Sequence, residues 1–194
     1  MRTILLVRHA AHDNVGGFLA GRMPGVRLGA AGRAQAERLA KRLASEKLDA
    51  VQTSPRERTR ETAEAIARAS GLGEACIADG LDEIDFGAWT GKTFDALDAD
   101  PAWRKWNEQR AMARTPAGDS MEQVQARALA HIKTLTAERV ALVSHADVIK
   151  TVVCGVLGLP LDAGPRFDIA LASITRLAAG PGEMKLAGLN EVIW

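Results

Sequence analysis

The sequence contains no tyrosine, and aromatic residues make up only 4% of its 194 positions. Proteins that bind single-stranded nucleic acids stack the bases on aromatic rings, so this composition disfavours such a partner. The formal net charge of +1 agrees, because no strong electrostatic field would attract a nucleic acid or a membrane surface. We therefore expect no nucleic-acid partner and no membrane partner.

Cysteines and long apolar runs are also scarce. The two cysteines, Cys76 and Cys154, provide no disulfide framework and suit a reducing compartment. The apolar run near the N-terminus is too short for the core of a signal peptide and ends at Arg8, and no stretch approaches a transmembrane span. These absences favour a cytoplasmic protein, and they leave its oligomeric state open.

The remaining composition, 47% hydrophobic and 25% charged, is typical of one globular domain. Amphipathic helical patterns lie between the strand-like runs; a capping box at Ser120 opens one of them, and Gly158 ends another. Strands that alternate with such helices predict a three-layer α/β/α sandwich with a mainly parallel sheet. The strand-like runs cover about 3–8, 48–53, 139–145, 172–177 and, more weakly, 184–189.

Residues 79–118 interrupt this alternation. They contain three of the four tryptophans, Trp89, Trp103 and Trp106, and many glycine, aspartate and proline residues. We predict that this segment is a lid insertion over the sheet edge, within a single domain that spans 1–194. We expect its aromatic side chains to pack mainly on one another.

Arg8 and His9 stand where the first predicted strand ends. In open α/β sheets, ligands bind at the carboxyl ends of the strands. A guanidinium can hold a phosphate anion while a neutral imidazole attacks phosphorus. On its own, the pair is more typical of an ordinary strand end at the surface, so this interpretation depends on which other groups reach the same edge.

A second cation is expected there because a helix follows the strand 48–53. Ser54 can cap that helix with Pro55 at its first position, which places Arg58 in the first turn. A helix N-terminus favours anions, and an arginine there strengthens the site. We expect the two neighbouring arginines, Arg56 and Arg60, to be solvated.

A second histidine and an acid complete the candidate site. The apolar run 140–144 ends in His145, so two strands would each bring a histidine to the same edge, and His145 would carry a proton to donate to a phosphate. Glu83 and Asp85 lie among apolar residues, where a carboxyl group has a raised pKa and can protonate a leaving alcohol. The spacing does not show which of the two acids faces the site.

Four motifs in this order make the chain resemble the histidine phosphatase superfamily, which includes the cofactor-dependent phosphoglycerate mutases. The family's strand-Arg-His-Gly signature resembles residues 7–10, and its arginine motif resembles residues 54–63. Its acid motif, Leu-x-Glu followed by Gly-x-Trp-x-Gly, resembles residues 81–91, and its second histidine motif resembles residues 143–149. The resemblance covers about residues 2–177.

The resemblance implies a metal-independent phosphatase that hydrolyses phosphate monoesters of a small metabolite and needs no cofactor. His9 would be the nucleophile that becomes phosphorylated, and Glu83 would protonate the departing alkoxide. Arg8, Arg58 and His145 would bind the phosphoryl oxygens. A hydrogen bond from the other ring nitrogen of His9 to a backbone carbonyl would fix its tautomer.

Two other functions stay open: a phosphotransferase of the phosphoglycerate mutase type, and a non-catalytic regulatory module that binds a phosphorylated ligand. Hydrolysis is favoured over the mutase because the chain is short and lacks a long insertion to close the site. It is favoured over the binding module because binding alone needs no acid such as Glu83. A zinc hydrolase is disfavoured, since a nearby arginine would repel the cation and no ligand motif joins its candidate ligands, His9, His12, Asp13 and His145.

Four positions depart from the family pattern. Ala10 replaces the usual glycine, and its methyl group would crowd the pocket. Ala11 and His12 stand where the family has an acidic or amide residue and a hydroxyl, so His12 is a candidate for substrate contacts. Val15 replaces the usual asparagine, and Asn14 is one place away.

Overall fold

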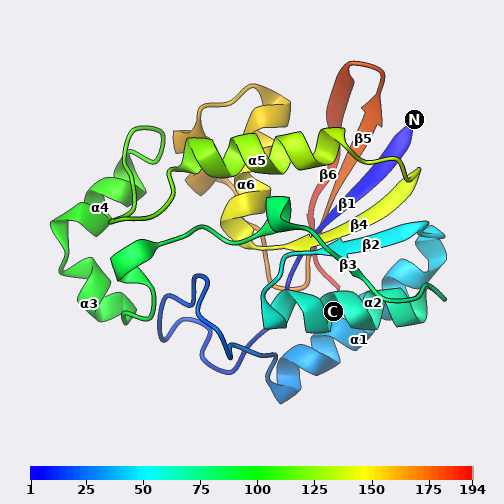
Figure 1. The fold of residues 1–194 in the computed structure, drawn as a ribbon, viewed down its shortest axis with the longest axis horizontal. Coiled ribbons are helices and arrows are strands. Elements are labelled where there is room, and N and C mark those ends of the chain that lie inside the picture. Colours follow the sequence, from blue (N-terminus) through cyan, green and yellow to red (C-terminus); the bar gives the residue numbers. More distant parts are fainter. Residues whose placement is uncertain (194) are drawn as a thin grey trace.

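The computed structural model describes residues 1–193, which form a six-stranded sheet in the order β3-β2-β4-β1-β5-β6 (Figure 1). Neighbouring strands are parallel from β3 to β1, whereas β5 is antiparallel to both β1 and β6. The predicted mainly parallel sheet is therefore confirmed. The strands are β1 (Arg2–Arg8), β2 (Ala50–Thr53), β3 (Cys76–Ile77), β4 (Arg139–Ser144), β5 (Ile174–Gly180) and β6 (Glu183–Glu191).

Helices cover both faces of the sheet (Figure 1). Alternation along β1 explains the two layers, because successive side chains of a strand point to opposite faces. Leu5 and Val7 pack with α1 and α2, whereas Ile4 and Leu6 pack with α5 and α6. The predicted three-layer sandwich is confirmed. The covering helices are α1 (Ala30–Leu43), α2 (Glu57–Ala69), α5 (Met121–Lys133) and α6 (Ala146–Leu157).

Helix ends agree with the sequence patterns at two places and differ at a third. Ser120 and Gln123 form the predicted capping box at the start of α5, and Gly158 ends α6 in the left-handed conformation with φ of 64°. The prediction that Ser54 caps α2 is wrong, because the helix begins at Glu57 with Arg56 in the cap position. No helix within residues 1–193 is long and apolar enough to cross a membrane.

The shortest strand, β3, was not expected from the sequence. It has only two residues, too few for a periodic pattern, and it forms one edge of the sheet. Its Cys76 is exposed, whereas Cys154 lies buried on α6, and both thiols are free. Neither cysteine lies in the candidate site described below.

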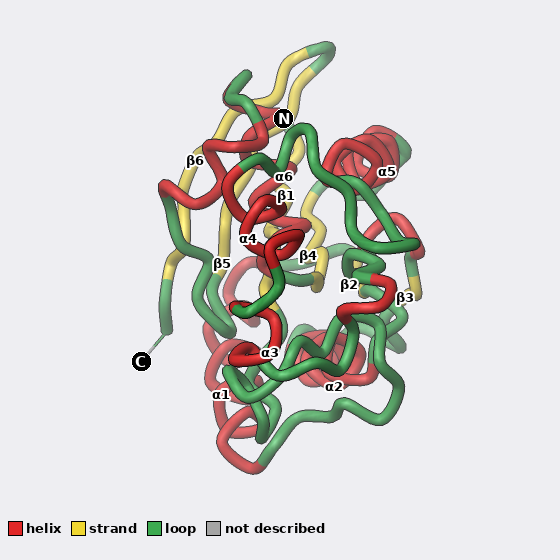
Figure 2. Tube along the Cα trace, turned by 90° about the vertical axis from the view of Figure 1, so that its left-hand side faces the viewer, coloured by secondary structure: helices red, strands yellow, loops and turns green. Residues whose placement is uncertain are grey.

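Residues 79–118 contain α3 (Phe94–Asp98), α4 (Pro101–Glu108) and two short 3-10 turns. Figure 1 shows α3 and α4 to one side of the sheet, and Figure 2, turned by 90°, shows them in front of the strands. The expected aromatic packing is confirmed: the indole of Trp89 lies 5.2 Å from that of Trp103 and 6.2 Å from that of Trp106, centroid to centroid, and all three are buried. A role of this segment as a lid stays a prediction.

Candidate active site

The two predicted strand-end histidines meet at the carboxyl ends of β1 and β4. These strands are parallel neighbours, with Arg8 opposite Ser144, and the backbone N–H of His9 donates to the carbonyl of Ser144 at 3.0 Å. The rings of His9 and His145 approach to 5.3 Å between centroids in an edge-to-face arrangement. Residues 136 positions apart in the sequence thus share one buried site.

The ring of His9 is held in one tautomer. Its Nδ1 lies 2.8 Å from the carbonyl oxygen of Ala10, and because a carbonyl only accepts, Nδ1 carries the proton. Nε2 is therefore free of a proton, and it accepts a hydrogen bond from Nε of Arg58 at 3.3 Å. Burial, followed by the charges of Arg58 and Arg8, lowers the pKa of His9 well below its usual value. The ring is thus neutral, with a lone pair on Nε2.

Two guanidinium groups share the cavity with the ring of His9. Arg58, 1% exposed, donates from Nη2 to the carbonyl of Gly21 at 2.8 Å, and Arg8 donates from Nη1 to the carbonyl of Ile169 at 2.6 Å. Burial lowers the pKa of both groups, but arginine stays charged at neutral pH. Within residues 1–193, the buried Nη1 of Arg58 and Nε of Arg8 have no hydrogen-bond partner. The pair provides two positive charges and unused donors, which suit an anion.

Glu83, rather than Asp85, faces this site. Its Oε2 lies 3.3 Å from Nδ1 of His145 and 3.8 Å from Nη2 of Arg58. Burial raises the pKa of Glu83 to about 7, although Arg58 opposes the shift. The side chain of Asp85 is 43% exposed and accepts from the backbone N–H of Gly87. The choice that the sequence left open is therefore settled by burial.

His145 is neutral in this arrangement. Arg58 donates from Nη2 to Nδ1 at 3.2 Å, which leaves the proton on Nε2, and Nε2 donates to the hydroxyl of Ser54 at 2.8 Å. Burial, followed by the charge of Arg58, lowers the pKa of His145 well below its usual value. This direction does not support the expected protonated ring, because both effects favour the uncharged form.

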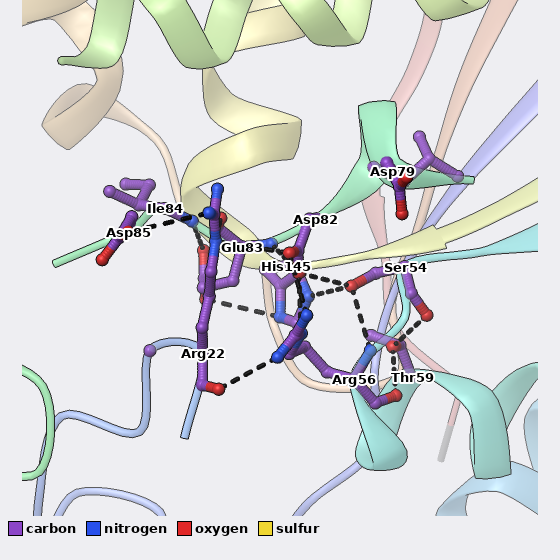
Figure 3. Close-up of polar contacts among 12 residues, drawn as sticks. Arg22, Ser54, Arg56, Thr59, Asp79, Asp82, Glu83, Ile84, Asp85 and His145 are labelled. Carbon is purple, nitrogen blue, oxygen red and sulfur yellow. Dashed lines mark hydrogen bonds and ion pairs between the residues drawn. The ribbon is translucent and has the colours of Figure 1, made fainter. Parts of the chain in front are cut away.

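A network of ion pairs fixes the segment that carries Glu83 (Figure 3). Arg56 pairs with Asp82 through two nitrogens, at 2.9 and 3.1 Å, and Arg22 donates from Nε to the carbonyl of Glu83 at 2.8 Å. The hydroxyl of Ser54 donates to Asp82 at 3.2 Å, so the network continues to His145. The prediction that Arg56 is solvated is wrong, because its side chain is paired with Asp82. The predicted exposure of Arg60 is confirmed.

Sequence reasoning missed three supporting residues. The sequence predicts Ser54 only as a helix cap and places Asp82 only in the acid motif, whereas the two side chains bond to each other and, through Ser54, to His145. Arg127, on α5, donates to the carbonyls of both Asp82 and Glu83, at 2.6 and 3.0 Å. A buried serine before Pro55 and an arginine on an amphipathic helix give no local signal of such contacts, since their partners lie far along the chain.

The residues that depart from the family pattern differ in whether they line the cavity beside His9. The methyl group of Ala10 packs in the core with β1 and α1 and does not line the cavity beside His9, so the expected crowding is not seen. His12 and Val15 line this cavity, which has a volume of about 130 Å³, and the ring of His12 lies 6.2 Å from that of His9. Asn14 lies outside it.

No metal-binding cluster accompanies these residues. Within residues 1–193, no group of three or more His, Cys, Asp or Glu side chains is arranged to hold a metal ion. The alternative of a zinc hydrolase therefore has no ligand set in this part of the chain. The geometry instead combines a neutral imidazole nitrogen, two guanidinium groups and a carboxyl group whose pKa is near neutrality.

Comparison with known proteins agrees with this geometry. A model of the histidine phosphatase superfamily, branch 1, matches residues 4–192. The chain belongs to the histidine phosphatase superfamily. Its membership confirms the resemblance carried by the four sequence motifs, and it extends that resemblance to β6.

Relatives and solved structures of this superfamily have several functions. Phosphoserine phosphatase 1 of Hydrogenobacter thermophilus is 32% identical over 83% of this chain and 79% of its own length. A probable phosphoglycerate mutase of Photorhabdus laumondii is 32% identical over 75% of this chain and 70% of its own. Among structures, a mycobacterial glucosyl-3-phosphoglycerate phosphatase is 26% identical, with a TM-score of 0.88 and coverage of 98% and 99%. Phosphoserine phosphatase of Entamoeba histolytica, solved with 3-phosphoglyceric acid, is 26% identical, with a TM-score of 0.85 and coverage of 99% and 98%.

Proposed function

We propose that this histidine phosphatase hydrolyses phosphate monoesters of small metabolites through a phosphohistidine on His9. One observation carries the proposal: the unprotonated Nε2 of His9 lies beside Arg58, at 3.3 Å, in a cavity that Arg8 and Glu83 also line. A nucleophile, two cations and an acid are the groups that transfer of a phosphoryl group to nitrogen requires. The relatives named as phosphatases support hydrolysis.

In the first step, the lone pair of His9 Nε2 attacks phosphorus and the bond from phosphorus to the ester oxygen breaks. Glu83, protonated near pH 7 because of its raised pKa, gives its proton to the departing oxygen, which leaves as an alcohol. The guanidinium groups of Arg8 and Arg58 offset the negative charge on the phosphoryl oxygens. The carbonyl of Ala10 still accepts from Nδ1, so it stabilises the charged ring of the phosphoenzyme.

In the second step, water attacks the phosphohistidine. Glu83 is now a carboxylate, and it takes a proton from the attacking water. The bond between Nε2 and phosphorus breaks, the electron pair returns to the ring, and inorganic phosphate leaves. His9 and Glu83 are then in their starting states.

The two alternatives have weaker support. One relative is named a probable phosphoglycerate mutase, but the similar structures described above are phosphatases, so the mutase is not better supported. A non-catalytic binding module would not need a buried carboxyl group with a pKa of about 7 beside the anion site.

The test is hydrolysis of para-nitrophenyl phosphate together with capture of the phosphoenzyme. A radiolabelled ester, quenched in alkali, should leave label on the wild-type protein, and His9→Ala should lose both the label and the turnover. Addition of a chelator should leave the rate unchanged. Hydrolysis by His9→Ala at the wild-type rate would refute this mechanism, and loss of activity in the chelator would indicate a metal hydrolase.

A further inference from the structure

The cavity beside His9 is lined by both charged and apolar side chains. The arginine and acidic residues among them are Arg8, Arg58 and Glu83. Among the described residues that line it, no lysine and no third arginine occurs. We name its apolar side chains the apolar wall: Val15, Phe18, Leu19, Ala20 and Phe94.

Backbone hydrogen bonds hold the apolar wall in place. Phe18 forms a β-bridge with Thr93, the N–H of Leu19 donates to the carbonyl of Lys92 at 2.9 Å, and the N–H of Gly91 donates back to Leu19 at 2.8 Å. These contacts join the loop after His9 to the start of α3. They bring Phe18 and Phe94, 76 positions apart in the sequence, to the same cavity.

Aromatic contacts support the wall from both sides. The ring of Phe18 lies 6.0 Å from that of His12, and the ring of Phe94 lies 6.5 Å from that of Trp103. Val15, which also lines the cavity, is 45% exposed. An apolar group of a ligand would cover these side chains and remove them from water.

The charges at the site match a single phosphate group. Arg8 and Arg58 carry two positive charges, and a phosphate monoester near neutral pH carries close to two negative ones. Burial, followed by Arg58 and Arg8, lowers the pKa of His12, so this residue adds no charge at neutral pH. The nearby Arg22 and Arg110 are already paired, with Asp119 and Asp147 respectively, both within 2.9 Å.

A second anionic group on the substrate would therefore have no counterion at this site. On binding, this group would lose its hydration and lie next to apolar side chains and Glu83. Removing an unpaired charge from water in this way costs binding free energy. A neutral substituent would instead gain from contact with the apolar wall. This difference acts on binding in both the ground state and the transition state, so it changes kcat/KM.

We infer that the preferred substrates are phosphate monoesters of uncharged alcohols with an apolar part, and that esters with a carboxylate close to the phosphate are poor substrates. This inference rests on the proposed function and names the substrate class of that same site. It separates this chain from the Entamoeba histolytica relative, whose structure holds 3-phosphoglyceric acid.

Three esters of primary alcohols test it. Glycerol 3-phosphate has a neutral hydroxymethyl group at the position where 3-phosphoglycerate has a carboxylate. The third ester, 3-phenylpropyl phosphate, is neutral apart from its phosphate and has an apolar ring. We expect kcat/KM to be about tenfold or more higher for glycerol 3-phosphate than for 3-phosphoglycerate, and higher again for the phenylpropyl ester. A kcat/KM for 3-phosphoglycerate that equals or exceeds the neutral esters would overturn the inference.

A charge added to the apolar wall gives a second test. Val15→Lys should raise kcat/KM for 3-phosphoglycerate by roughly fivefold or more and lower it for the phenylpropyl ester, whereas Val15→Met, similar in length but neutral, should do neither. Lys92→Gln removes a lysine outside the cavity lining and should leave the order of the three esters unchanged. A loss of 3-phosphoglycerate hydrolysis in Lys92→Gln, or no gain in Val15→Lys, would contradict the inference.

Para-nitrophenyl phosphate distinguishes a wrong substrate class from a wrong proposed function. If the wild-type protein hydrolyses it but prefers 3-phosphoglycerate among the three esters, only the substrate class is wrong. If the folded protein hydrolyses none of the four, the proposed function fails and the substrate class fails with it.

Discussion

Arg127 donates a hydrogen bond from Nη2 to the carbonyl oxygen of Asp82 at 2.6 Å. The same nitrogen reaches the carbonyl of Glu83 at 3.0 Å, and Nη1 reaches the carbonyl of Gly80 at 3.1 Å. One side chain of α5 thus binds three backbone carbonyls of the segment that carries Glu83. Arg127 does not line the cavity, so we regard it as a positioning residue.

Replacing this guanidinium should disturb proton transfer to the leaving group. We expect Arg127→Met to lower kcat for alkyl phosphates by about tenfold, because a small displacement of an acid is enough to slow proton transfer, and to change the rate for para-nitrophenyl phosphate little. KM should be nearly unchanged. The control is Arg38→Met, which removes an exposed arginine of α1. Equal losses for both kinds of ester would mean that Arg127 acts on the whole site rather than on the acid.

The raised pKa of Glu83 predicts how the rate of hydrolysis depends on pH. A general acid must carry its proton, so kcat/KM for alkyl phosphates should fall as the pH rises through about 7, the pKa of this group. Glu83→Gln should abolish that falling limb and lower the rate below pH 7. For para-nitrophenyl phosphate, whose leaving group needs no proton, the limb should be weak in both proteins. If the decrease of kcat/KM at high pH persists in Glu83→Gln, a group other than Glu83 is responsible for it.

The same pKa affects stability. Glu83 binds its proton more tightly in the folded protein, where its pKa is about 7, than in the unfolded chain, where its pKa is near 4.5. The folded state therefore holds more protons between these two values, and the free energy of unfolding decreases as pH rises across that window. Relative to Glu83→Gln, the wild type should lose up to roughly 3 kcal/mol from pH 4 to pH 8, as each pKa unit corresponds to about 1.4 kcal/mol. Urea unfolding at several pH values measures this difference. An unchanged difference would show that the carboxyl group is not buried as described.

Gly32, in the first turn of α1, determines how closely the loop after His9 can approach that helix. A Cβ at this position would collide with the carbonyl oxygen of Ala11. We expect Gly32→Ala to displace the loop, to cost roughly 1–3 kcal/mol of unfolding free energy, and to lower kcat/KM. Gly73→Ala is the matched control, since a Cβ there has open space around it. Wild-type stability and activity in Gly32→Ala would show that the helix can shift without cost.

The sequence was enough to predict the sheet class and the residues that meet at its edge, because each lies in a local pattern. His9 and His145 end apolar strands, and parallel strands bring their carboxyl ends together whatever the loops do. Arg58 was placed correctly in the first turn of α2, although the cap was not. The contacts of Ser54, Arg56 and Arg127 could not be predicted, because they depend on how the segment around Glu83 crosses over the sheet. The choice between Glu83 and Asp85 depended on burial, which two acids so close in sequence do not reveal.

The position of β1 has a consequence for synthesis of the chain. β1 lies inside the sheet, and both of its neighbours, β4 and β5, come from residues 139–180. During translation the first strand is made long before either partner, so its apolar side chains have no sheet to join until most of the chain has left the ribosome. Arg8 and Arg58 are made early, but His145 and the strand that brings the site together are made only late. A nascent chain that ends before β4 contains Arg8, His9 and Arg58 but lacks His145 and the strand beside β1, and we expect it to be unable to capture phosphate.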